Sequence, residues 1–196
     1  MFHLVDQKKK VLGNMKRDMN TVKVGAYHEA AHVVVGMMFK HYLDSRGVEI
    51  AGVGTGNQDL SGLCCTVQDN TEENSVITLM AGRIAESKLS GKPLRHCFDK
   101  GVILYALEMM CRGYADLQGD TEGVIQAIMD EVNNKFTPEI MEKIENYQEQ
   151  TIEILDRPLV WKSITAVAEQ LLVVGKMSPD ELDEVLQSVN QRYSGE

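Results

Sequence analysis

The stretch Ala26-Tyr27-His28-Glu29-Ala30-Ala31-His32 contains the pattern HExxH. Residues four apart lie on one face of a helix, so His28 and His32 are predicted to bind a single zinc ion. Glu29 cannot join the same tetrahedral shell, but it is close enough to take a proton from a metal-bound water. Zinc lowers the pKa of such a water to about 7, which makes hydroxide available as a nucleophile at neutral pH.

This pattern rarely arises by chance. With the chain's own His and Glu frequencies, the probability of an HExxH somewhere in 196 residues is about 1%. The segment from Gly25 to about Leu43 is rich in Ala, Val and Met, and it predicts a helix that is apolar on most sides and therefore buried. Unpaired imidazoles are costly to bury in such a helix, and binding of a metal removes that cost.

A catalytic zinc site needs a third protein ligand and one open position for water. Asp99 opens the apolar helix expected at residues 98 to 112, and its carboxylate would face a neighbouring buried helix if the apolar side packs inward. For an aspartate at the start of a helix, simple N-capping is the competing interpretation. The other candidates for the third ligand are Asp116, Asp120, Glu86, His96 and Cys97.

The rest of the chain predicts further helices and one small β element. Residues 47 to 53 and 63 to 67 are short β-rich runs separated by Gly and Asn, which indicates a hairpin or a sheet edge. Helices are expected at residues 72 to 91, 98 to 113, 121 to 134, 138 to 155 after a Thr137 cap, 159 to 174, and from a capping box at Ser178 to Gln191. The expected fold class is mainly α: a zincin-like HExxH helix with a small β hairpin or sheet and a C-terminal helical bundle.

Composition indicates one globular domain with a core of ordinary size, because 43% of the 196 residues are hydrophobic and 25% are charged. The net charge of −9 argues against nucleic acid as the main partner, since phosphate binding needs a basic face. Residues 1–20 carry a local Lys/Arg run, which we interpret as a solvated N-terminal arm, with docking to an acidic partner as the alternative. Residues 21–196 are expected to form the single domain.

Neither a membrane span nor a secretion signal is expected. A span needs about 18 uninterrupted apolar residues, whereas the densest run, Val33 to Phe39, ends at Lys40. The first ten residues, MFHLVDQKKK, lack an apolar core followed by a cleavage site. The 4 cysteines form no CxxC pair and are expected to be reduced thiols. These features predict a cytoplasmic protein.

Three segments resemble the peptidase domain of FtsH-type ATP-dependent zinc metalloproteases. AYHEAAHVVVG at 26 to 36 resembles the family's AYHEAGHAxxG, and LMAGRIAESKLSG at 79 to 91 resembles its GGRxAEExxxG. VEIAGVGTGNQDLSGLCCTV at 48 to 67 occupies the place of the family's β segment. The part from TEGVIQAIMDEV to MSPDELDEVL is similar to the family's closing helices, so the resemblance covers most of the chain.

This resemblance implies zinc binding by His28, His32 and Asp99, and catalysis by Glu29. The third ligand of the family is an aspartate that starts the next helix, and Asp99 has that place here. Glu86 is expected to accept a hydrogen bond from a metal-bound histidine, because such histidines need an acceptor for the second ring nitrogen.

Members of that family carry an ATPase module and a membrane anchor, whereas this chain contains no GxxxxGK[ST] phosphate loop. The sequence therefore predicts a zinc metalloendopeptidase that hydrolyses peptide bonds in unfolded proteins or peptides. A homo-oligomer and a separate ATPase partner are both compatible with it. The alternative is a catalytically silent, zinc-containing interaction or regulatory module, although such a module has no need of Glu29. Iron, manganese and cobalt are alternative metals, since imidazole and carboxylate ligands accept them.

Overall fold

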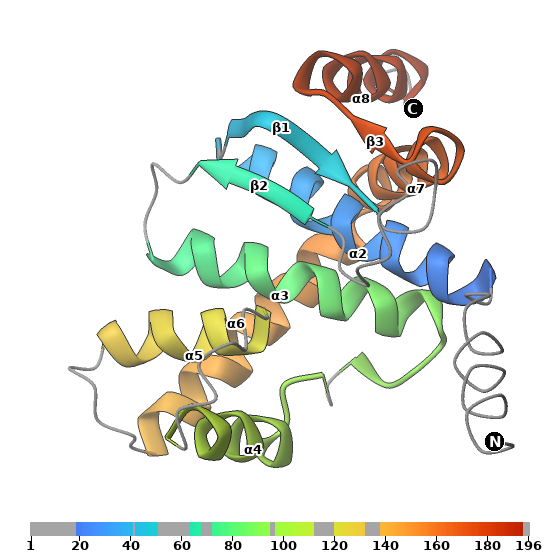
Figure 1. Cartoon of the computed structure of the whole chain (residues 1–196). Helices are drawn as coiled ribbons and strands as arrows, with labels where there is room; N and C mark the ends of the chain where they lie inside the picture. The colour runs from blue at the N-terminus through green and yellow to red at the C-terminus, as the bar shows by residue number, and fades with distance from the viewer. Residues whose placement is uncertain are drawn as a thin grey trace, which may run out of the picture.

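The computed structural model describes residues 19–40, 42–50, 63–67, 72–94, 97–111, 120–131 and 138–193. Within these ranges the chain is mainly helical with a small antiparallel sheet, which confirms the predicted fold class (Figure 1). The helices are α2 (Met19–Met38), α3 (Glu72–Leu89), α4 (Lys100–Cys111), α5 (Asp120–Glu131), α6 (Pro138–Asp156), α7 (Pro158–Val174) and α8 (Pro179–Tyr193). The strands are β1 (Tyr42–Glu49), β2 (Leu63–Val67) and β3 (Lys176–Met177).

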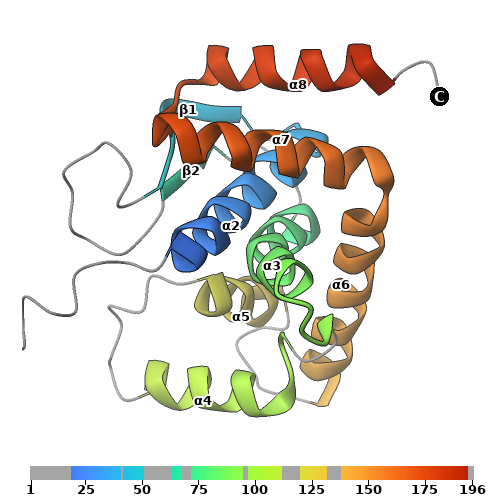
Figure 2. The same cartoon turned by 90° about the vertical axis from the view of Figure 1, so that its right-hand side faces the viewer.

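Helix α2 lies at the centre of the fold. It packs against α3 on one side and α7 on another, and the sheet covers part of its remaining surface (Figures 1 and 2). Ala26, Ala30 and Ala31 are fully buried, and such small side chains allow neighbouring helices to approach closely. Because α2 is enclosed in this way, its polar residues need partners inside the protein.

Helix α3 separates α2 from the lower helices in Figure 1. It contacts α2, and it also contacts α5 and α6. Helix α4 packs on α5 at the bottom of the molecule, while α8 lies beside α7 at the top (Figure 2). None of the described helices combines the length and the apolar character that crossing a membrane requires.

The sheet has the order β2-β1-β3, with β1 in the centre and both neighbours antiparallel to it. The pairing of β1 with β2, in which Tyr42 is opposite Val67, confirms the predicted β element. Strand β1 also pairs with β3, where Val48 is opposite Met177. Gly47 precedes this contact with a positive φ of 74°, and a Cβ there would overlap with the carbonyl oxygen of Met177. A glycine is therefore required where β1 passes β3.

The largest difference from the predicted elements is at the ends of α2. The helix spans residues 19 to 38 instead of 25 to 43, so it includes Met19 and Asn20 of the predicted N-terminal arm; residues 1–18 lie outside the described residues. Lys40 has a positive φ of 61°, and its amide donates a hydrogen bond to the Met37 carbonyl at 3.0 Å, which closes the last turn. Tyr42 and Leu43, at the end of the predicted helix, belong to β1 instead, because periodicity alone does not separate the start of a short strand from a helix end.

The capping box predicted before α8 is confirmed. The Glu181 amide donates to Ser178 Oγ at 3.4 Å, and the Ser178 amide donates to Glu181 Oε2 at 2.8 Å. Helix α7 ends at Gly175, whose φ is 77° and whose amide donates to the Leu171 carbonyl at 2.8 Å. Strand β3 follows and was not predicted, because two residues show no alternation. Thr137, the predicted cap of α6, lies outside the described residues.

Candidate metal centre

His28 and His32 lie one turn apart on α2, and their Nε2 atoms are 3.0 Å from each other. The Nδ1–H of His28 donates a hydrogen bond to Glu86 Oε1 at 2.7 Å, and the Nδ1–H of His32 donates to the Thr78 carbonyl at 2.7 Å. Both acceptors belong to α3. Because these acceptors hold a proton on each Nδ1, the neutral form of each ring has its lone pair on Nε2, which is the tautomer that binds a metal.

Asp120, the first residue of α5, brings a third acceptor atom to the same point. Its Oδ2 lies 2.8 Å from His28 Nε2 and 3.2 Å from His32 Nε2. Donor atoms that surround one zinc ion tetrahedrally at about 2.0 Å are themselves about 3.3 Å apart. The spacing of the three atoms is close to that value, so this group has the arrangement of a three-ligand metal site.

Gly82 on α3 provides the space in which these three atoms meet. A Cβ at this position would overlap with His32 Nε2 and would lie 2.8 Å from His28 Nε2. Any larger residue here would therefore displace the two imidazole rings from the position in which Asp120 Oδ2 reaches them. Oriented imidazoles, a converging carboxylate and a space without a side chain together fit a bound divalent cation.

The electrostatics favour positive charge at this point. Burial lowers the pKa of His28, but hydrogen bonds with Asp120 and Glu86 outweigh it and raise that pKa to about 10. Burial raises the pKa of the Asp120 carboxyl, while its contacts with both histidines hold it well below its usual range. Three acceptors this close repel one another unless a proton or a cation lies between them. A metal ion would supply that charge.

Glu29 is next to this group on α2 and is only 7% exposed. Burial raises the pKa of its carboxyl, and the two nearby histidines oppose that shift. A carboxylate whose pKa is raised accepts a proton more readily near neutral pH, as a general base must. The position and burial of Glu29 are therefore compatible with the role that the HExxH pattern predicts.

Asp99, the expected third ligand, does not join this group. It is exposed, and its Oδ1 accepts a hydrogen bond from the Val102 amide at 3.0 Å, as an N-cap does. The physical reason is the position of the helix that it opens, since α4 packs on α5 at the edge of the fold. The helix-opening aspartate that reaches His28 and His32 is Asp120, so it replaces Asp99 as the candidate third ligand.

The structure also gives the contacts of two other candidates for the third ligand, Glu86 and Cys97. Glu86 contacts the Nδ1 side of His28 and so has the expected role of hydrogen-bond acceptor. Cys97 is buried, its Sγ donates to Ser87 Oγ at 3.1 Å, and burial raises the pKa of its thiol, which disfavours the thiolate that binds metals. Asp116 and His96 lie outside the described residues.

Two parts of the site escaped the sequence-based prediction. The Thr78 carbonyl belongs to the main chain and has no sequence signal. Gly82 lies inside the GGR-like segment, but a single glycine within a helical pattern does not reveal what it faces. Asp120 was among the alternatives, and it is preceded by a glycine and followed by buried Val124, Ile125 and Ile128.

Comparison with known proteins does not identify the chain. No family model matches it, and a search of the curated proteins finds no similar sequence. The geometry of the candidate metal centre therefore carries the functional conclusion.

Proposed function

We propose that the protein is a zinc metalloendopeptidase whose metal is held by His28, His32 and Asp120. The observation that carries this proposal is the convergence of two imidazole Nε2 atoms and one carboxylate oxygen, 2.8 to 3.2 Å apart, beside a buried glutamate. Hydrolytic zinc enzymes use three protein ligands of this type and leave a fourth position for water. Two histidines and one carboxylate form a ligand set of that kind.

The chain's own residues divide the work of hydrolysis. When bound, zinc supplies Lewis acidity that polarises the scissile carbonyl and acidifies water. Glu29 takes the proton of the attacking water and passes it to the leaving amine, which its raised pKa favours. Glu86 and the Thr78 carbonyl hold the two imidazole rings in the orientation in which Nε2 points to the metal.

The resemblance to the peptidase domain of FtsH-type proteases supports a peptide bond as the substrate. The third ligand that the resemblance implies is Asp99, before the next helix α4, whereas the spacing of the donor atoms favours Asp120 at the start of α5. We also propose that its substrates are unfolded polypeptides and that it is cytoplasmic. Its assembly would be either a homo-oligomer or a complex with a separate ATPase. The net charge of −9 supports the exclusion of nucleic acid.

The direct test compares two aspartates that both open helices. We expect the wild-type chain to bind about one zinc ion, Asp120→Ala to lose it and Asp99→Ala to keep it, as measured by plasma mass spectrometry. Glu29→Gln should retain zinc and lose cleavage of an unfolded casein substrate, because it removes proton transfer and leaves the ligands in place.

Two results would contradict the proposal in different ways. A wild-type chain that binds zinc but cleaves no better than Glu29→Gln would favour the catalytically silent interaction module. A wild-type chain that binds no metal under any condition would overturn the metal centre itself.

A further inference from the structure

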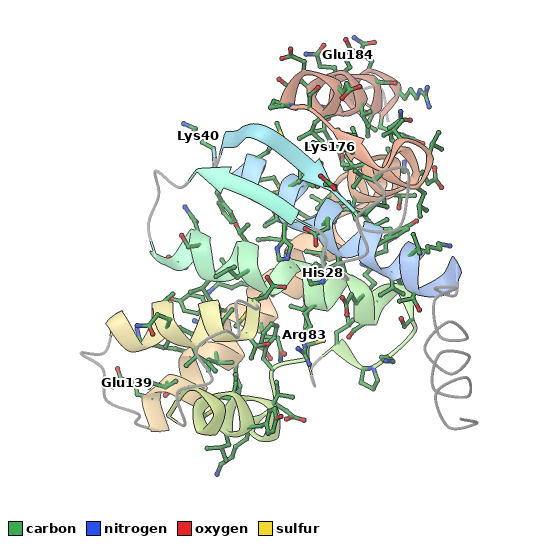
Figure 3. All side chains as sticks on the ribbon, viewed as in Figure 1. His28, Lys40, Arg83, Glu139, Lys176 and Glu184 are labelled. Carbon is green, nitrogen blue, oxygen red and sulfur yellow. The ribbon has the colours of Figure 1, made fainter. Side chains whose placement is uncertain are left out.

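One hydrogen bond ties α3 to the first turn of α5. Arg83 donates from Nη1 to Thr121 Oγ1 at 3.2 Å, and Thr121 is only 7% exposed. Arg83 directly follows Gly82, and Thr121 directly follows Asp120. Arg83, the neighbour of Gly82, therefore holds Thr121, the neighbour of the proposed third ligand Asp120. Figure 3 labels Arg83 of α3 and His28 of α2, with Arg83 lower in the view than His28.

Asp120 needs such a restraint more than the histidines do. His28 and His32 lie inside α2, and each ring is oriented by a hydrogen bond from its Nδ1. Asp120 is the first residue of α5, and the ends of helices fray. A displacement of about 1 Å in this turn would be large compared with the tolerance of roughly 0.2 Å on a metal–ligand distance.

Packing between α3 and α5 sets the distance between the two helices. It does not by itself fix the position of the first turn of α5. A Cβ at Gly123 would lie 3.0 Å from Leu79 Cδ1, so the two helices approach closely at this point. Close approach and the buried side chains of Val124, Ile125 and Ile128 hold the body of α5, whereas fraying of its first turn would still move Asp120 away. The bond from Arg83 to Thr121 restrains that turn.

Helix stability alone does not explain the contact. A cation beside the N-terminus of a helix is electrostatically unfavourable, because the helix macrodipole is positive at that end. Arg83 nevertheless donates to the first turn of α5. The contact is accounted for if its effect is to hold the carboxylate that precedes Thr121.

We infer that Arg83 is a positioning residue for the metal centre: through Thr121 Oγ1 it holds the first turn of α5 so that Asp120 Oδ2 meets the two histidine Nε2 atoms. Neither Arg83 nor Thr121 is a ligand, and their effect on zinc is indirect. This inference rests on the metal site of the proposed function.

The test is a double-mutant cycle on zinc affinity in the full chain, measured by competition with a chromophoric chelator. Thr121→Val keeps the shape and removes the hydroxyl, and Arg83→Ala removes the donor. We expect each to weaken zinc binding by about 10-fold, and the double variant by about 10-fold as well, since both remove one interaction. Thr121→Ser, which restores the hydroxyl, should stay within about threefold of wild type.

Lys92→Ala is the matched control, because it removes a positive charge just beyond α3 from an exposed residue. It should leave zinc affinity unchanged. Thermal unfolding of the metal-free variants separates positioning from folding, since a purely structural role would lower the melting temperature and leave the zinc affinity of the folded chain intact. Unchanged affinity in Thr121→Val, or additive effects in the double variant, would overturn this inference while the proposed function stands. Absence of zinc from the wild type would overturn both.

Discussion

At Gly82, α3 presents only a hydrogen atom to the imidazole rings of His28 and His32. A methyl group there would overlap with the Nε2 atoms of both histidines, which are the atoms that Asp120 Oδ2 approaches. Every other residue type would push at least one of these groups away. The requirement for glycine at this position is therefore steric, and it concerns the two imidazole rings more than the backbone.

We expect Gly82→Ala to weaken zinc binding by at least about 100-fold, a loss larger than that for partners outside the ligand set. Isothermal titration with zinc would measure it. Gly25→Ala on α2 is the matched control, because nothing lies within 4 Å of a Cβ there. That variant should bind zinc normally and gain about 0.5–1 kcal/mol of stability, since alanine is the better helix former. Wild-type zinc affinity in Gly82→Ala would show that the metal does not bind where the three atoms meet.

At the scale of elements, α4 and α5 show why the sequence favoured Asp99 over Asp120 as the third ligand. Asp99 directly precedes α4, and Asp120 is the first residue of α5. Both helices carry apolar residues at helical spacing. The two aspartates are equivalent by local criteria. Packing separates them, because α5 lies against α3 beside the histidines and α4 lies on the outer side of α5.

The first turn of α8 provides a local test at the same scale. Ser178→Ala removes the hydroxyl that accepts from the Glu181 amide and contacts its carboxylate, and loss of an N-cap of this type lowers the melting temperature by about 2–4 °C in a chain of this size. Ser188→Ala, inside α8, should cause no such loss, because alanine is favoured in a helix interior. Circular dichroism melts would compare the two. Equal melting temperatures would mean that the capping box contributes nothing measurable.

At the scale of the whole molecule, the candidate centre joins three helices. Helix α2 supplies the two imidazoles, α3 supplies their hydrogen-bond acceptors and the space at Gly82, and α5 supplies Asp120. A metal bound there would link residues 28 and 120, which are far apart in the chain. Removal of the metal should therefore loosen the contact of α5 with the rest of the fold.

Zinc is expected to stabilise the whole chain by linkage. Free zinc at 100 times its dissociation constant adds about 2.7 kcal/mol, which corresponds to a rise in melting temperature of roughly 5–10 °C for a chain of this size. A chelator should reverse the rise. Asp120→Ala should show no response to either reagent, whereas Asp99→Ala should respond like wild type. An equal response in both variants would contradict the assignment of Asp120.

The sequence by itself determined the local features of this protein. The helix around HExxH, the β1 and β2 pair, the α8 capping box and the contact of Glu86 with His28 all follow from patterns within short segments or from a resemblance in such segments. Each depends on neighbours along the chain or on a motif of known spacing. Periodicity, caps and side-chain type are sufficient to predict features of that kind.

Only the tertiary structure decided which aspartate meets the histidines, what Gly82 faces, and that Arg83 reaches Thr121. These facts depend on how α2, α3 and α5 pack, and helix packing is set by side chains that are distant in sequence. Local helix propensity does not distinguish α5, which carries the candidate ligand Asp120, from α4, which follows Asp99. The candidate metal site is therefore a property of the packed helices, while its histidines are already evident in seven consecutive residues.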